Sequence, residues 1–408
     1  LGIENGIIAI TKIDKATKGR LRQLTQEIKE LVRDSIFTSA KIFEVSNTTE
    51  EGIVNLLNDL KSETVRIGSQ QENSGDRNFR YLIDRAFSVK GIGTVVTGCV
   101  KSGSINKDEH IAISRSADPT KVKAIRIDKK DAETIALNQR AALNLDTNLE
   151  NISRGDWLID PSILHPTTRL DVTINLLKPS LSLKAGAEYH LFIGTSHHIV
   201  SIRQLTKNSP FFQIKAQSAI IAHYGDRFIL RDPASQHTIG GGKVIDVFVP
   251  RKKRSSEERI RTLTASNQED GLALKSLIET SPSGLNLREF SIKRNLKSHK
   301  IEMFLKELRD KELEYVRLEE KTSKDAIILS NDYFKIYARR MITLVENFHS
   351  ANVNVQGISE LSLSREAQLP ASHLFFNCVL QVLLEKKLLN LTGTLFHLPS
   401  HKASLSIE

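Results

Sequence analysis

Apolar and polar residues alternate in three different ways along the 408-residue chain, and each way predicts a different kind of structure. Between residues 7 and 66, two apolar runs are each followed by a segment with apolar residues at helical spacing. This is the order of parallel strands joined by crossover helices. The helical positions are Leu21, Leu24, Ile28 and Leu31 in the first segment, and Ile53, Leu56, Leu57 and Leu60 in the second. We therefore predict half of an α/β domain at residues 1–67, with a capping box, Thr48-x-x-Glu51, before the second helix.

The middle of the chain has the pattern of all-β structure. A polar stretch without apolar residues, 68–78, predicts a linker. Beyond it, short β-rich runs such as Thr94-Val-Val-Thr97 and Arg227-Phe-Ile-Leu230 are separated by Gly, Asn and Asp. A stretch around Pro166 divides this region, so we expect two β-barrels, at 79–165 and at 166–250. The three glycines Gly240, Gly241 and Gly242 are expected to mark a bulge or a close approach of two strands.

The last part of the chain returns to helical spacing in two similar stretches. The first has a helix at 297–310, with Ile301, Phe304, Leu305 and Leu308 on one face, and then a strand at 314–318. The second has helices at 363–369 and 372–386, separated by Pro370, and then a hairpin around Gly393. The apolar face of its second helix includes Phe375, Val379, Val382 and Leu383. The order of helix, turn, helix and strand predicts two winged-helix modules, at 251–332 and 333–408.

Charge and cysteine content narrow the class of protein. Lys and Arg number 58 against 48 Asp and Glu, which favours a polyanionic partner, although a mildly basic balance also serves solubility. The two cysteines, Cys99 and Cys378, are too far apart in the chain for a disulfide scaffold or a zinc site, and this indicates a reduced, cytoplasmic protein. No apolar run approaches the ~18 residues that cross a bilayer, so we expect no membrane partner.

Candidate chemistry begins directly after the first apolar run. Thr11-Lys12-Ile13-Asp14 is similar to the guanine-reading motif of translational GTPases, Asn-Lys-x-Asp. An ionised Asp14 can accept two parallel hydrogen bonds from N1–H and the exocyclic amine of guanine, and adenine has no matching pair of donors. Lys12 would lay its methylenes along the base. A solvated loop between strand and helix is the alternative for so short a motif.

A second segment, Ser46-Asn47-Thr48, ends the next apolar run, where these GTPases place a loop whose backbone N–H contacts the guanine carbonyl. The predicted GTP-binding residues are Thr11, Lys12, Asp14, Ser46 and Asn47.

The motifs for phosphate binding and Mg²⁺ sensing do not occur in the sequence. The stretch from Gly93 to Gly98 has the glycine spacing of a phosphate loop but lacks its lysine. The chain also begins at Leu1 and enters a strand almost at once. We therefore expect a truncated nucleotide-binding domain that binds GTP weakly, with Mg²⁺ held through the missing front half. GTP hydrolysis is not predicted for this chain alone.

The barrel region carries a more specific resemblance. Residues 83–98, Ile-Asp-Arg-Ala-Phe-Ser-Val-Lys-Gly-Ile-Gly-Thr-Val-Val-Thr-Gly, resemble the opening strands of the second domain of elongation factor Tu, and residues 227–245 resemble the closing strands of its third domain. Asp84-Arg85 and Gln139-Arg140 match the selenocysteine-specific branch. With the order of half a P-loop GTPase domain, two all-β barrels and two winged-helix modules, the chain resembles the bacterial selenocysteine-specific elongation factors.

This resemblance implies a monomeric factor that binds GTP and delivers selenocysteyl-tRNA to the ribosome at recoded UGA codons. It implies that Asp84, Arg85 and Arg140 hold the selenocysteyl group. A selenol is largely ionised at neutral pH, whereas a serine hydroxyl or a cysteine thiol is not, so two guanidiniums favour the selenolate. Asp84 would orient Arg85 and reduce the repulsion between the two cations. Surface ion pairing is the alternative for such arginines.

The resemblance also bears on the end of the chain and on rival functions. In the family the last modules grip a hairpin in the selenoprotein messenger RNA, and this chain stops at Glu408, where further modules would follow. A general aminoacyl-tRNA carrier would end after the third domain. A DNA-binding regulator with two winged helices is the alternative of another class. Three histidines, His190, His197 and His198, are expected on a barrel surface or facing tRNA, because no metal-ligand spacing surrounds them.

Overall fold

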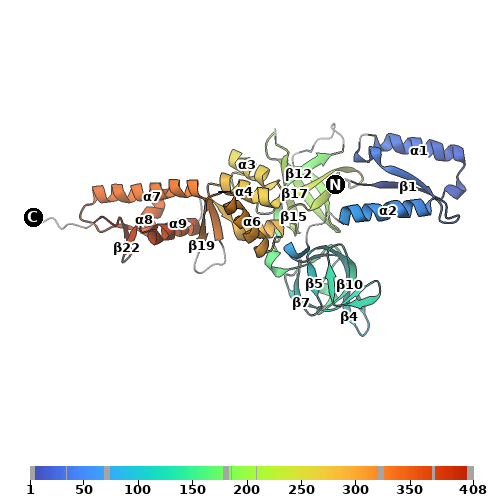
Figure 1. Cartoon of the computed structure of the whole chain (residues 1–408), viewed down its shortest axis with the longest axis horizontal. Coiled ribbons are helices and arrows are strands. Elements are labelled where there is room, and N and C mark those ends of the chain that lie inside the picture. Colours follow the sequence, from blue (N-terminus) through green and yellow to red (C-terminus); the bar gives the residue numbers. More distant parts are fainter. Residues whose placement is uncertain are drawn as a thin grey trace, which may run out of the picture. The chain divides into compact units, whose positions relative to one another are not determined.

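The computed structural model describes residues 5–33, 35–68, 74–177, 183–184, 186–207, 209–319, 326–369 and 373–401. Residues 69–73 of the predicted linker, Pro370, Ser372 and residues 402–408 lie outside these ranges. The chain divides into two compact units, Leu1–Asn73 and Ser74–Glu408 (Figure 1), so the boundary falls within the predicted linker.

The first unit contains two parallel strands and two helices in the predicted order. Strand β1 (Ile7–Thr11) pairs in parallel with β2 (Lys41–Val45), and Thr11 lies opposite Val45. Helix α1 (Lys18–Val32) begins after Thr17, whose side chain accepts a hydrogen bond from the backbone N–H of Arg20, and α2 (Ile53–Gly68) follows β2. The two carboxyl ends of the strands therefore meet at one edge of the sheet.

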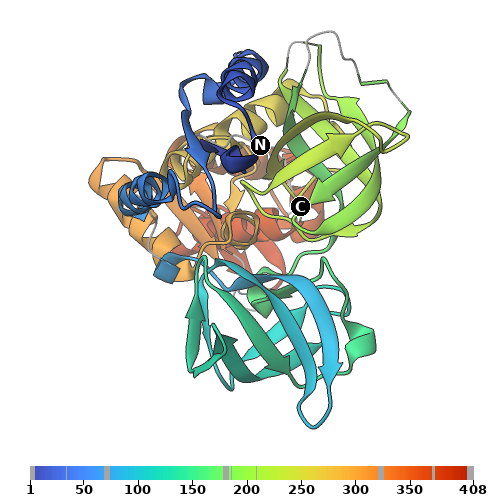
Figure 2. The ribbon, with the colours of Figure 1, turned by 90° about the vertical axis from the view of Figure 1, so that its right-hand side faces the viewer.

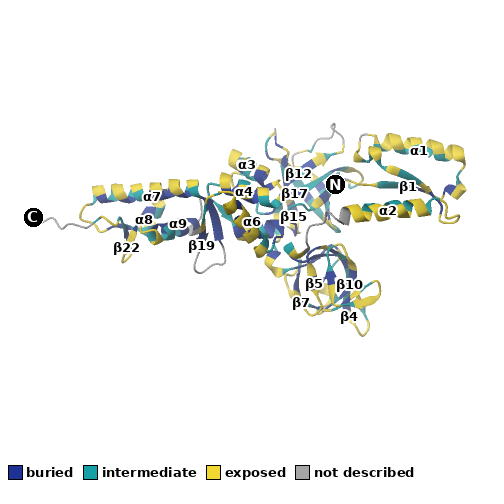
Figure 3. Cartoon of the chain, viewed as in Figure 1, coloured by how far each residue is buried: buried dark blue, intermediate teal, exposed yellow. Residues whose placement is uncertain are grey.

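The helices of this unit are largely exposed, and one expectation for it, the capping box, is wrong. The apolar stripes of its helices are poorly covered, since Leu31 is 84% exposed and Leu60 is 43% exposed, because a sheet of two strands is too narrow to bury both helices (Figure 3). The capping box Thr48-x-x-Glu51 is not formed. Instead, the backbone N–H of Thr48 donates to the side chain of Ser46, and α2 begins only at Ile53.

The first barrel opens the second unit, as predicted. Its strands follow the order β10-β4-β3-β11-β6-β7, and β10 also pairs with β7, which closes the ring (Figure 2). Glycines at Gly91 (φ 80°) and Gly93 (φ 101°) make the tight hairpin between β3 and β4. The strands are β3 (Arg80–Val89), β4 (Gly93–Ser102), β6 (His110–Ile113), β7 (Pro119–Ile127), β10 (Arg140–Leu145) and β11 (Trp157–Ile159), with the short strands β5 (Ser104–Asn106), β8 (Lys130–Ala132) and β9 (Thr134–Ala136) beside them.

The second barrel is closed in the order β12-β15-β14-β13-β16-β17. The expected close approach at the three glycines is confirmed: a Cβ at Gly242 would collide with the carbonyl oxygen of Thr173 on β12. Alternating residues such as Leu170, Val172, Leu191 and Leu230 fill the interior. The strands are β12 (Thr167–Leu176), β13 (Glu188–Ile193), β14 (Ser196–Gln204), β15 (Phe211–Ile220), β16 (Arg227–Arg231) and β17 (Thr238–Asp246).

Two mixed helical and β-stranded parts complete the chain. The predicted apolar faces are confirmed by burial, for example at Ile301 and Leu305 in α6 and at Phe375 and Val379 in α9. The first part comprises α3 (Glu257–Ser266), α4 (Asp270–Thr280), β18 (Leu285–Asn286), α5 (Leu287–Arg294), α6 (Ser298–Asp310), β19 (Tyr315–Glu319) and β20 (Ala326–Ser330). The second comprises α7 (Asn331–Ala351), β21 (Ile358–Ser359), α8 (Glu360–Ala367), α9 (His373–Glu385), β22 (Asn390–Thr392) and β23 (Leu395–His397).

Within the second unit, the parts are joined by buried polar contacts. The end of the predicted linker is ordered: Arg77 pairs with Asp270 of α4 at 3.0 Å, and the backbone N–H of Asn78 donates to the side chain of Asn295 at 3.1 Å. Helix α7, which the sequence pattern did not single out, shares one core with strands β19 and β20. None of the helices in the described ranges is long and apolar enough to cross a membrane.

Candidate guanine and aminoacyl sites

The predicted guanine motif lies where β1 and β2 end side by side. Lys12 leaves β1 with a left-handed backbone (φ 60°), and Asp14 follows in a short 3₁₀ turn, Ile13–Lys15. The hydroxyl of Ser46, directly after β2, donates to Oδ1 of Asp14 at 2.6 Å. The structure thus brings Asp14 and Ser46 together, because parallel pairing places the ends of both strands at the same edge.

Ser46 also organises the loop that follows β2. It is fully buried, and its hydroxyl oxygen accepts hydrogen bonds of 3.2 Å from the backbone N–H groups of Thr48 and Thr49. Asp14 and Asn47 are exposed beside it, so the carboxylate and the loop face solvent together. The sequence identified Ser46 as a member of the loop but gave no sign that it holds the loop in shape.

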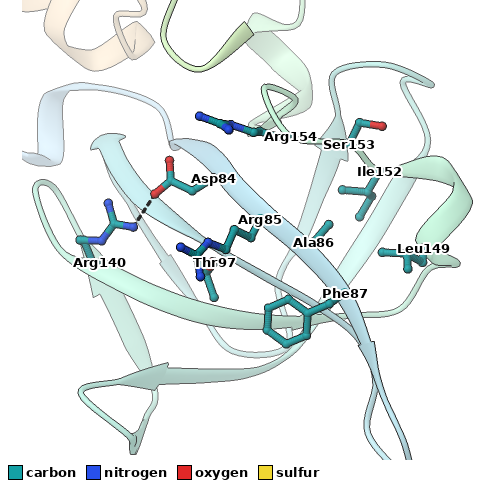
Figure 4. Close-up of a pocket in the computed structure, with 10 residues that line it drawn as sticks. All are labelled: Asp84, Arg85, Ala86, Phe87, Thr97, Arg140, Leu149, Ile152, Ser153 and Arg154. Atoms are coloured by element: carbon teal, nitrogen blue, oxygen red, sulfur yellow. Dashed lines mark hydrogen bonds and ion pairs between the residues drawn. The ribbon is translucent and has the colours of Figure 1, made fainter.

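The predicted aminoacyl residues gather at an open pocket on the first barrel, with a volume of about 970 Å³ (Figure 4). Strand β3, strand β4, the start of β10 and the loop before β11 supply its walls. Three guanidinium groups and one carboxylate give the pocket a positive balance. The lining residues are Asp84, Arg85, Ala86, Phe87, Thr97, Arg140, Leu149, Ile152, Ser153 and Arg154.

Asp84 pairs with Arg140 and not with Arg85, which corrects the expectation that Asp84 orients Arg85. The reason lies in the strand register. Ile83 lies opposite Gly98 and Arg85 opposite Thr97, so Asp84 is the extra residue of a β-bulge. A bulge re-aims a side chain, and here it turns Asp84 toward β10. The hydrogen bond to Asp84 raises the pKa of Arg140.

The other two cations of the pocket, Arg85 and Arg154, differ from Arg140 in their partners. The guanidinium groups of Arg85 and Arg154 are exposed and form no ion pair within the ranges that the structure describes. Arg154 was not predicted from the sequence, because it lies in a loop without periodicity. Only the pairing of β11 with β3 brings that loop beside β3.

A buried tyrosine supports the strand that carries Arg140. The hydroxyl of Tyr81 donates to the carbonyl oxygen of Ala141 at 2.8 Å, and Tyr81 itself is inaccessible to solvent. Its ring lies against Gly98, where a Cβ would come within 2.9 Å of it. Burial raises the pKa of Tyr81, so the hydroxyl stays a proton donor at neutral pH. The hydrogen bond from Tyr81 thus holds the backbone of β10 in place beside the pocket.

The three histidines lie on the second barrel. His190 and His197 are hydrogen-bonded through their rings at 2.7 Å on neighbouring strands β13 and β14, and His198 is near Ser218. Among the described residues, no group of three His, Cys, Asp or Glu side chains is arranged to hold a metal ion.

Comparison with known proteins gives a consistent result. Residues 167–251 match the family model described as the β-barrel domain of selenocysteine-specific elongation factor. The chain is 27% identical over 415 aligned positions to the selenocysteine-specific elongation factor of Haemophilus influenzae and 25% identical over 405 to that of Escherichia coli. Each alignment covers 98% of this chain and 62% of the relative, so the chain spans less than two thirds of their length.

Solved structures agree at the level of fold. A crystal structure of a bacterial selenocysteine-specific elongation factor, EF-Sec, superposes with a TM-score of 0.75 at 18% identity, over 98% of this chain and 62% of that one. Translation elongation factor SelB from Methanococcus maripaludis, solved with the GTP analogue GppNHp, gives a TM-score of 0.51 at 19% identity over 59% of each chain. The predicted resemblance is thereby confirmed: over almost its whole length, this chain is similar to the selenocysteine-specific elongation factors.

Proposed function

We propose that this chain is part of a translation elongation factor that binds GTP and selenocysteyl-tRNA and delivers the tRNA to the ribosome at recoded UGA codons. The observation that carries the proposal is the pocket on the first barrel. Three arginines and one aspartate face its opening, which gives it a net charge suited to a single anionic group. Named relatives of the chain are selenocysteine-specific elongation factors.

The pocket would discriminate cargo by charge. Selenocysteine and serine differ by one atom, so shape alone offers little selectivity. The selenolate is an anion at neutral pH, and charge-assisted hydrogen bonds from Arg85 and Arg140 favour it over a neutral hydroxyl. Arg154 adds a third positive charge at the rim. In this assignment Arg85 and Arg140 bind the selenocysteyl group, and Asp84 lies beside them in an ion pair with Arg140.

We assign guanine binding to the edge formed by β1 and β2. Oδ1 of Asp14 accepts from Ser46, and the exposed carboxylate retains a second oxygen for the base. In this assignment Lys12 covers the face of the base, while Thr11 and the backbone at Asn47 complete the loop. When bound, GTP would supply the free energy that orders the factor around its tRNA.

The remaining assignments follow the same family comparison. We propose residues 1–67 as part of a P-loop GTPase domain, 68–78 as a linker, and 79–165 and 166–250 as the second and third domains. Residues 251–332 and 333–408 would be winged-helix modules, in which α6 and α9 are the second helices of their helix-turn-helix units. The factor would act as a monomer on the ribosome, and the last modules of the family's arm would bind a hairpin in the selenoprotein messenger RNA.

The test is filter binding of the chain to selenocysteyl-tRNA, to seryl-tRNA on the same tRNA body, and to duplex DNA. We expect selective retention of the first. Arg85→Ala and Arg140→Ala should each reduce the preference for selenium cargo about fivefold, since each removes one charge-assisted contact. Arg126→Ala is the matched control, because Arg126 is an arginine of the same barrel paired with Asp131 outside the pocket. Equal retention of all three nucleic acids would refute the proposal and favour a general carrier or a DNA-binding protein.

A further inference from the structure

We infer that the carboxylate of Asp84 pairs with Arg140 while the pocket is empty and is displaced from it when an anionic cargo binds. The inference rests on the proposed function, because it assigns the cargo of this pocket a negative charge. It concerns how the empty site is neutralised, and it makes Asp84 a competitor of the cargo and not one of its ligands.

The geometry of the pair supports a replaceable partner. Within the residues that the structure describes, Oδ2 of Asp84 contacts only Nη2 of Arg140, so the other donors of that guanidinium remain available. The side chain of Arg140 is 66% exposed and that of Asp84 is 26% exposed, so the pair lies at the solvent boundary. Exposed ion pairs of this kind contribute little free energy, and an incoming anion can therefore replace one partner.

Asp84 is not required to hold Arg140 in place. Arg140 is the first residue of β10, where it lies opposite Cys99 of β4. The next residue, Ala141, receives the hydrogen bond from the buried Tyr81. The backbone at Arg140 is therefore fixed by the sheet and by Tyr81, whichever partner its guanidinium has. A carboxylate on a bulge beside it acts mainly through its charge.

The two possible roles of Asp84 predict opposite signs. If Asp84 competes, then removing its charge strengthens the binding of every anion at the pocket, both the selenolate and small anions such as phosphate. If Asp84 positions Arg140, then its removal weakens the binding of the selenolate. In the first case the aspartate protects the empty site from free anions and keeps the affinity for cargo low enough for release.

The experiment compares wild type with Asp84→Asn, whose amide oxygen can still accept a hydrogen bond from Arg140. We expect the ratio of selenocysteyl-tRNA to seryl-tRNA affinity to rise about two- to fivefold, which is the range measured for breaking exposed ion pairs. Inorganic phosphate should inhibit binding of selenocysteyl-tRNA to the variant at lower concentration than to wild type. Removing the charge of Asp84 also makes the protein surface less acidic and so attracts any tRNA more strongly. Dividing by the affinity for seryl-tRNA removes this general effect from the comparison.

Asp131→Asn is the matched control, since Asp131 is an exposed aspartate of the same barrel in an ion pair outside the pocket. It should change neither the ratio nor the phosphate sensitivity, and circular dichroism should show all three proteins folded. A lower or unchanged ratio for Asp84→Asn would overturn the inference while leaving the proposed function intact. If wild type itself fails to prefer selenocysteyl-tRNA, the proposed function fails, and the inference falls with it.

Discussion

The hydroxyl of Ser46 donates a 2.6 Å hydrogen bond to Oδ1 of Asp14, across 32 residues of chain. The bond joins the turn after β1 to the loop after β2. Because Ser46 is buried and also accepts from two backbone N–H groups of its own loop, it fixes the loop and the carboxylate as one unit. Recognition of a base by a carboxylate depends on such fixed geometry.

Ser46→Ala should weaken binding of guanine nucleotide by the chain about five- to tenfold, since a hydrogen bond to a charged group is lost and the loop is loosened. Asp14→Ala should abolish the preference for guanine over adenine. Titration with fluorescent GDP and ADP analogues measures both effects. Thr25→Ala is the control, because the Thr25 hydroxyl bonds only to its own helix α1. Unchanged guanine affinity in Ser46→Ala would contradict the assigned role.

Arg259→Met should lower the free energy of unfolding by about 3 kcal/mol, because breaking a buried ionic network leaves uncompensated charge. Arg259 contacts Asp171 at 2.5 Å and Asp246 at 3.0 Å, and all three residues are buried between the second barrel and α3. Urea unfolding followed by circular dichroism provides the measurement. Arg261→Met changes an exposed arginine of the same helix and should have little effect. Equal stability of the two variants would show that the buried network contributes nothing.

The stability of the second unit should fall as the pH falls below about 6.5, and His223 is the source. Burial, with a further contribution from Arg80, lowers the pKa of His223 from 6.5 to about 3. Between pH 6.5 and pH 3, His223 therefore binds a proton in the unfolded chain but not in the folded chain. Its contribution to the free energy of unfolding is complete above pH 6.5 and is lost as the pH falls toward 3. At pH 5 the loss amounts to about 2 kcal/mol.

His223→Gln removes this titration and keeps a side chain that can donate to the carbonyl of Ile163, as the ring now does at 3.2 Å. The variant should lose less stability than wild type between pH 7.5 and pH 5 in urea unfolding. His110→Gln, at an exposed position, should behave like wild type. Parallel pH profiles for wild type and His223→Gln would exclude this source of acid sensitivity.

Asn295→Asp should loosen the junction between the first barrel and α5. The side-chain amide of Asn295 donates to the carbonyl of Asn78 at 3.2 Å and to Ser102 at 2.7 Å, and an aspartate would replace this donor by a buried charge. We expect a loss of about 1–3 kcal/mol. Hydrogen exchange at residues 76–79 should become faster. Asn138→Asp is the control, because Asn138 is exposed and has the same left-handed backbone, and it should leave exchange unchanged. Unchanged exchange in Asn295→Asp would contradict the prediction.

Local pattern sufficed for much of the architecture. Apolar spacing predicted the parallel strands and helices of the first unit, the two barrels and the apolar faces of α6 and α9, because periodicity depends only on neighbouring residues. The same reasoning failed for the capping box at Thr48, where a buried Ser46 takes the backbone N–H. Helix α7 was also missed, since its stripe packs against strands of the preceding part.

The candidate sites also depend partly on the sequence and partly on the tertiary structure. The sequence by itself determined which residues we propose for the sites: Asp14 in a motif of fixed spacing, and Asp84, Arg85 and Arg140 in a family pattern. Only the tertiary structure decided their partners. A shift of register between β3 and β4 turns Asp84 toward Arg140, and the pairing of β11 with β3 brings Arg154 to the same pocket. Strand register and closure depend on pairings between distant segments, and no local pattern encodes them.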